Sequence, residues 1–242
     1  MVDTKKLSYH GNTRMVAHMG AASLEPENTI AAFIASCNRS YYGIETDVHV
    51  TKDKKVVCIH DSNTERVAGV KVMVEESNFD DLRKISLFDH DKVSYRVDLH
   101  IPSLAEYINI CKKYGKIAVL ELKNKMDEED VYMIYDEIEA LGYNDSTIYI
   151  SFAIENLHAI RRKNSEQTVQ YLTGSDINGE VVEQLKNLRY DLNIHCKLIT
   201  KELIDTCHKN GIAVNTWTVD DIDVAEDFIG LGIDYITSNA IE

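Results

Sequence analysis

The stretch GIETDVHV at residues 43–50 has the period of a β-strand and places ionisable groups on one face. Side chains alternate between the two faces of a strand, so Glu45, Asp47 and His49 share one face and the residues between them share the other. The face with Ile44 and Val48 is apolar and suits packing against helices. We therefore expect the acidic face to point into the interior of a barrel.

Strand-like and helix-like segments alternate along the rest of the chain. The strand that contains this stretch is expected at residues 42–50, and further strands are expected at residues 14–18, 117–123, 147–152, 168–172, 192–195, 213–218 and 235–237. Helical spacing of apolar residues is found at residues 29–37, 103–114, 129–141, 154–163, 179–188, 200–210 and 220–231. Eight strands alternating with helices in 242 residues predict an α/β protein with one (β/α)8 TIM barrel, residues 1–242. Residues 62–101 break the alternation, so we expect them to be an insertion within this domain after the second strand.

Composition restricts the classes of partner. The 40 acidic residues outnumber the 26 basic ones, for a formal charge of −14, which disfavours binding to nucleic acid or to an anionic membrane. The cysteines number five, form no CxxC pair and are scattered, which is typical of a reducing compartment. The first residues are polar and indicate no signal peptide. The sequence thus predicts a cytoplasmic protein with no stable membrane association and leaves its oligomeric state open.

Ionisable residues gather at the ends of several apolar runs. His18 ends the first predicted strand, His60 follows the apolar run at residues 56–59, and Glu121 and Lys123 share the inward face of a later strand. Each alone would more often be a solvated charge, but TIM-barrel active sites lie where strand ends converge. The carboxylates of Glu45, Asp47 and Glu121 would repel one another there unless a cation joined them. Oxygen ligands of this kind suit Mg²⁺ or Ca²⁺.

Several motifs resemble those of the glycerophosphodiester phosphodiesterase family. The first group is AHMG at residues 17–20, EPENT at 25–29, ETDVHVTKD at 45–53 and HD at 60–61. The second group is ELK at residues 121–123, SF at 151–152 and TWTVD at 216–220. Together they extend over nearly the whole chain, and the spacing between the ETD segment and the HD pair is specific.

The resemblance implies an enzyme that hydrolyses deacylated phospholipids to glycerol 3-phosphate and an alcohol. It implies that His18 and His60 are an acid/base pair, which histidines can be near neutral pH. It further implies that one divalent cation, Mg²⁺ or Ca²⁺, binds Glu45, Asp47 and Glu121, and that Lys123 contacts the phosphate. Trp217 would line the mouth near the glycerol or the leaving group, although a barrel-core aromatic is the competing interpretation. Neither the order of the two histidines nor the nucleophile, water or a neighbouring glycerol hydroxyl, follows from the sequence.

Two departures from the family pattern keep an alternative open. The family usually has Arg after the first histidine, where it would be a bidentate donor to phosphate, and this chain has Met19. The segment ITSNA at residues 236–240 stands where the family commonly has Asp followed shortly by Pro. The alternative is a weakened or non-catalytic barrel that binds a phosphorylated ligand, or a phosphodiesterase of shifted substrate. A phospholipase acting on intact lipid is disfavoured by the acidic charge.

Overall fold

The computed structural model describes residues 3–242 and shows a closed barrel of parallel strands. β1 pairs with both β2 and β9, which closes the ring. The barrel strands are β1 (Arg14–Ala17), β2 (Gly43–Val50), β4 (Ile117–Leu122), β5 (Thr147–Ser151), β6 (Val169–Thr173), β7 (Asp191–His195), β8 (Val214–Trp217) and β9 (Tyr235–Ser238). This arrangement confirms the predicted TIM barrel.

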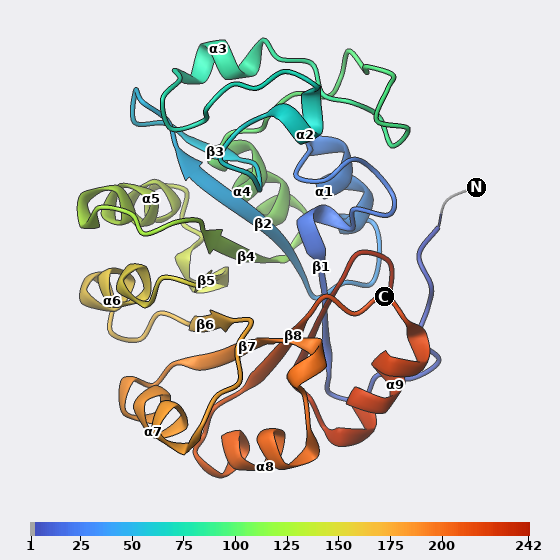
Figure 1. The fold of residues 1–242 in the computed structure, drawn as a ribbon, viewed down its shortest axis with the longest axis vertical. Helices are drawn as coiled ribbons and strands as arrows, with labels where there is room; N and C mark the ends of the chain where they lie inside the picture. The colour runs from blue at the N-terminus through green and yellow to red at the C-terminus, as the bar shows by residue number, and fades with distance from the viewer. Residues whose placement is uncertain (1–2) are drawn as a thin grey trace.

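Helices surround the barrel and follow its strands in turn (Figure 1). They are α1 (Ile30–Cys37), α4 (Leu104–Tyr114), α5 (Glu128–Ala140), α6 (Ile154–Lys163), α7 (Gly179–Leu188), α8 (Lys201–Lys209) and α9 (Ile222–Leu231). Each predicted helix is present with its ends within about two residues, the usual uncertainty of a helix terminus. Among residues 3–242, no helix is both long and apolar enough to cross a membrane.

Residues on the two faces of the strands lie in different layers, as the alternation predicts. Ile44 and Val48 of β2 belong to the large apolar layer between the sheet and the helices, as does Leu120 of β4. A second apolar cluster, which includes Val119 of β4 and Ile150 of β5, is built from residues on the opposite, inward face of the strands. Glu45, Asp47 and Glu121 share that inward face and are all buried.

One strand departs from the prediction and changes how the site is built. The run that precedes His60 forms β3 (Val56–Cys58), which lies outside the closed ring and pairs antiparallel with β2. His60 was expected at the end of a strand that converges on the mouth with the others. Instead, the chain turns after β2 and runs back along it, until the Ile59 amide donates to the Asp47 carbonyl at 3.0 Å. This reversal carries His60 to the level of Asp47.

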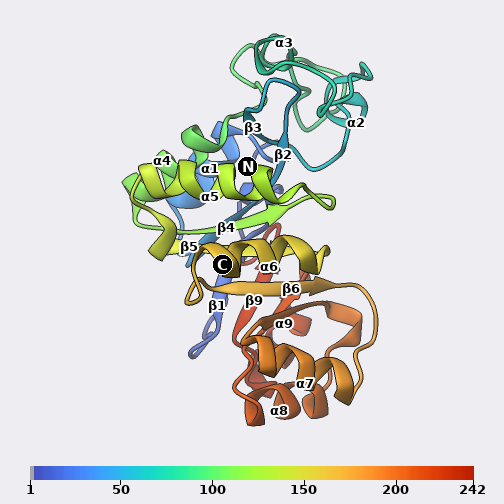
Figure 2. The same ribbon diagram turned by 90° about the vertical axis from the view of Figure 1, so that its left-hand side faces the viewer.

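Residues 62–101 contain only two short helices, α2 (Glu65–Ala68) and α3 (Phe79–Arg83). They lie to one side of the ring of helices, next to β2 and β3 (Figure 2). Val74, Leu82, Leu87 and Leu99 of this segment pack with Val57 of β3 in a small apolar cluster of their own. Three short 3-10 turns, η1 (His18–Gly20), η2 (Asn144–Ser146) and η3 (Cys196–Leu198), complete the described elements.

Candidate active site

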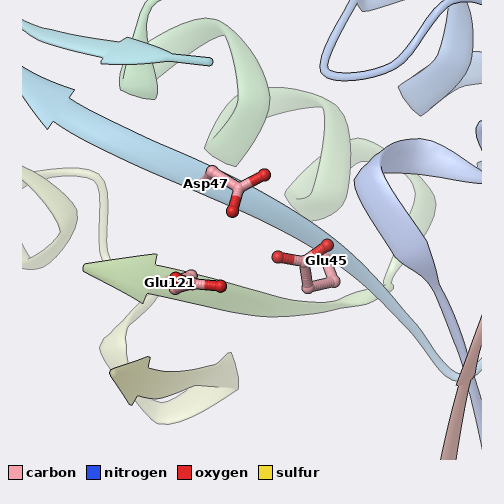
Figure 3. A group of neighbouring side chains, drawn as sticks. All are labelled: Glu45, Asp47 and Glu121. Carbon is pink, nitrogen blue, oxygen red and sulfur yellow. The ribbon is translucent and has the colours of Figure 1, made fainter. Parts of the chain in front are cut away.

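Three carboxylates from two adjacent strands meet inside the barrel mouth (Figure 3). Glu45 and Asp47 lie on β2 and Glu121 lies on β4, directly beside Asp47 in the register of the two strands. One oxygen atom of each side chain lies within 4.8 Å of the others. The structure therefore brings together the three residues that the sequence predicted as metal ligands.

Burial and mutual repulsion disturb the ionisation of this triad. Burial, followed by the charges of Asp47 and Glu121, raises the pKa of Glu45 well above its ordinary value. Burial and then Asp47 raise the pKa of Glu121 to about 7. Burial also opposes ionisation of Asp47, but Lys123, His60 and an amide hydrogen bond outweigh it and lower the pKa of Asp47. A carboxylate cluster of this kind is short of positive charge and is suited to a divalent cation.

Lys123 and Asn28 hold two of these carboxylates. The Lys123 Nζ lies 2.8 Å from Glu121 Oε1 and 3.3 Å from Asp47 Oδ1. Burial opposes its charge, yet Asp47 and then Glu121 raise the pKa of Lys123, which stays a cation. The Asn28 amide nitrogen donates to Asp47 Oδ2 at 2.8 Å, and its oxygen accepts from the Thr46 hydroxyl at 2.6 Å. The orientation of the Asp47 carboxylate is therefore set before any ligand binds.

His18 follows β1 in the turn η1, and its tautomer is determined by a hydrogen-bond chain. The Asn239 amide nitrogen donates to Asp220 Oδ2 at 2.7 Å, so the amide oxygen of Asn239 faces His18. That oxygen lies 2.8 Å from His18 Nδ1, which must therefore carry a proton. The Nε2 atom of His18 has no protein partner among residues 3–242 and is left for a ligand.

His60 has a similar arrangement on the other side of the triad. Its Nδ1 lies 2.7 Å from Asp61 Oδ1. The Arg66 guanidinium hydrogen-bonds the same carboxylate and lowers the pKa of Asp61 to about 2, so Asp61 is an ionised acceptor. Arg66 in turn pairs with Glu27. This leaves the His60 Nε2, like that of His18, available for chemistry.

A cavity of about 270 Å³ joins these groups. His18, Glu45, His60, Glu121 and Lys123 line one part of it. The rest is lined mainly by apolar and aromatic side chains from the strands on the other side of the barrel, which are Ile150, Phe152, Leu172, Asn193, Trp217 and Thr237. Phe152 meets Trp217 edge to face, with ring centroids 5.7 Å apart. Trp217 thus lines the cavity and also packs against the apolar cluster inside the barrel, so its position agrees with both interpretations of the sequence.

Met19 lies in η1 and acts through its backbone. Its φ is +49°, in the left-handed region, and its N–H donates to Glu45 Oε2 at 2.8 Å. Its carbonyl accepts from the backbone N–H of Asn28 at 2.9 Å. The turn therefore binds a triad carboxylate whatever the side chain at position 19 is, but a methionine contributes no positive charge.

Comparison with known proteins shows the family of this chain. The model of the glycerophosphoryl diester phosphodiesterase family matches residues 18–242. The chain belongs to this family. It is 26% identical over 238 residues to a glycerophosphodiester phosphodiesterase of Caldanaerobacter subterraneus, with 94% of each chain covered.

Solved structures of phosphodiesterases have the same fold. A glycerophosphodiester phosphodiesterase from Parabacteroides distasonis superposes with a TM-score of 0.78 at 25% identity, over 96% of this chain and 94% of its own. An Oleispira antarctica phosphodiesterase, solved with its product sn-glycerol 3-phosphate, gives a TM-score of 0.85 at 23% identity. That comparison covers 93% of this chain and 92% of the other.

The family motifs indicate some supporting residues but not all. Asn28 was visible in the PENT motif without an assigned role. Asn193 could have been found from period-two alternation in the strand at residues 192–195, which points its side chain inward. Asn239 had no signal of its own, since its place in the ITSNA segment indicated only a loop. The hydrogen bond from Asn239 to His18 joins residues from opposite ends of the chain.

Proposed function

We propose that this chain hydrolyses glycerophosphodiesters to sn-glycerol 3-phosphate and an alcohol, with His18 and His60 as the acid/base pair and a divalent cation at Glu45, Asp47 and Glu121. The observation that carries the proposal is the convergence of a buried carboxylate triad, a lysine and two histidines on one cavity. Family membership and the names of its relatives support the same reaction. The glycerol 3-phosphate bound to the Oleispira antarctica enzyme is the product expected here.

The triad fits a hard divalent cation. Its donors are all carboxylate oxygens, the set preferred by Mg²⁺ and Ca²⁺ rather than by zinc or copper. The raised pKa values of Glu45 and Glu121 reflect the same shortage of positive charge. A bound cation would polarise the phosphoryl group and stabilise its developing charge.

The lysine and histidines would supply the remaining chemistry. Lys123 is a partly buried cation beside the triad and would offset the negative charge that builds on the phosphoryl oxygens. The attacking hydroxyl must lose a proton and the leaving oxygen must gain one. The Nε2 atoms of His18 and His60 are free for these transfers, each typically worth about 10²- to 10⁴-fold in rate. Either histidine fits either role, and the nucleophile can be water or the neighbouring glycerol hydroxyl.

The test is an assay of glycerol 3-phosphate release from glycerophosphocholine and glycerophosphoethanolamine. Metal-stripped protein should be inactive, and added Mg²⁺ or Ca²⁺ should restore release. His18→Ala and His60→Ala should each lower kcat at least about 100-fold. Activity that persists in both variants would refute the histidine pair, and no release by the native chain with either metal would refute the reaction.

A second candidate, a weakened enzyme or one of shifted substrate, is favoured by the uncharged side chain at position 19. In this case Met19→Arg should raise kcat/KM for glycerophosphocholine by about tenfold, chiefly through KM, because a guanidinium would bind the phosphate. Met19→Leu is the matched control, since it changes the side chain without adding charge. An arginine variant no better than the leucine variant would count against this candidate.

A further inference from the structure

We propose that Asn193 forms a hydrogen-bonding subsite for a hydroxyl group of the substrate's glycerol moiety. This inference rests on the proposed function and adds a residue that selects the substrate. Asn193 lies on β7 and lines the cavity shared by the triad and the histidines. It is thus placed to contact the same ligand from the opposite side.

The amide of Asn193 is polar, buried and unpaired. The residue is 2% exposed, and its Oδ1 has no hydrogen-bond partner among residues 3–242. Buried polar groups are nearly always satisfied in folded proteins, because an unmade hydrogen bond leaves the desolvation of the group uncompensated. The amide nitrogen of Asn193 has no hydrogen-bond partner among residues 3–242 either, and because the residue lines a cavity, we assign this amide to a group that enters that cavity.

The surroundings of Asn193 favour a hydroxyl. Leu172 of β6 lies beside it in the register, and Trp217 of β8 lines the same cavity. The indole Nε1 of Trp217 is also buried and unpaired. An amide and an indole N–H that lack partners, beside Leu172 on one strand and Asn215 on the other, suit a group that can both donate and accept. An alkyl chain with hydroxyl groups has this character, and a second phosphate does not.

The position of the subsite favours glycerol over the head group. β5 and β6 separate β4 from β7, so Asn193 faces the cavity from across the barrel relative to Glu121 and Lys123. A phosphate beside Lys123 can therefore extend one of its alcohols toward Asn193. The alcohol common to all glycerophosphodiesters is glycerol, so a preformed amide that binds glycerol would serve every substrate of the proposed reaction.

The test measures selectivity for glycerol without relying on turnover. Calorimetric titration of the Mg²⁺-supplemented enzyme would give Kd for sn-glycerol 3-phosphate and for inorganic phosphate. The native chain should prefer glycerol 3-phosphate, and Asn193→Leu should reduce that preference about tenfold, the equivalent of one hydrogen bond. Asn193→Ser replaces the amide with a hydroxyl and is the second variant if Asn193→Leu does not fold. It should give a smaller reduction of the preference for glycerol 3-phosphate.

Tyr41→Phe is the matched control. Tyr41 is 1% exposed and its hydroxyl also has no partner among residues 3–242, but the residue does not line the cavity. Loss of this hydroxyl should leave the preference for glycerol 3-phosphate unchanged. A preference that is absent in the native chain, or that survives in both Asn193 variants, would overturn the inference and indicate that an internal water satisfies Asn193. If the preference depends on Asn193 but no diester is hydrolysed, the subsite stands and the proposed reaction fails.

Discussion

At the scale of single residues, the site depends on side chains that hold the reactive groups rather than on the reactive groups alone. Asn28 orients Asp47, Asp61 orients His60, and Asn239 orients His18. The Asn239 contact is the most informative of these, because the bond from its nitrogen to Asp220 sets which atom of the amide faces the histidine. The result is a His18 ring with its proton on Nδ1.

We expect Asn239→Leu to lower kcat roughly 10- to 100-fold, with little change in KM, because His18 would lose its fixed tautomer and orientation. The backbone bond from the Asn239 N–H to Asp220 does not involve the side chain and should persist. Nitrogen NMR of the His18 ring should show a mixture of tautomers in the variant. A single Nδ1-protonated tautomer in the variant would contradict this role.

At the scale of elements, the pairing of β2 with β4 creates the metal site. Parallel register places Asp47 beside Glu121, and strand alternation turns both inward together with Glu45. The hairpin of β2 and β3 then returns His60 to the same level. Two neighbouring strands and one reversal thus supply the triad, Lys123 and one histidine.

Because the register places Asp47 beside Glu121, metal binding should depend on pH. Because the pKa of Glu121 is raised to about 7, its proton must leave before it can bind a cation. Glu121 should therefore make the apparent affinity for Mg²⁺ rise about tenfold for each pH unit well below 7, and this contribution should level off above 7. Calorimetric titrations between pH 5.5 and 8 would measure this rise. Glu121→Gln should bind more weakly and lose this part of the slope, and an equal slope in the variant would assign the proton to another group.

At the scale of the whole molecule, the triad opposes folding until a cation binds. The pKa of Glu121 in the folded protein lies above its ordinary value of 4.5, so the stability it contributes is complete below about pH 4.5 and is lost as the pH rises through about 7. The contribution of Glu121 to the stability of the metal-free protein should accordingly be smaller at pH 7.5 than at pH 5.

We expect a metal concentration of 100 times its Kd to stabilise the native chain by about 2.7 kcal/mol, because the cation binds only the folded state. Thermal unfolding at pH 7.5, with and without Mg²⁺ or Ca²⁺, would show this as a rise in Tm. Asp47→Asn should abolish the rise, while Glu75→Gln, at a partly exposed carboxylate outside the triad, should retain it. A rise of equal size in Asp47→Asn would place the cation elsewhere.

Local patterns in the sequence predicted the secondary structure of this protein and the direction of its strand side chains. Period-two alternation in residues 43–50 predicted that Glu45 and Asp47 face inward, and apolar spacing predicted the helices, because both patterns depend only on neighbours along the chain. The folded chain was needed to show how His60 reaches the triad, that Asn239 holds His18, and that the inward-facing amide of Asn193 lacks a partner. These features arise from contacts between segments far apart in the sequence. Barrel closure sets such contacts through the register of strands and the path of turns, which no local pattern of residues encodes.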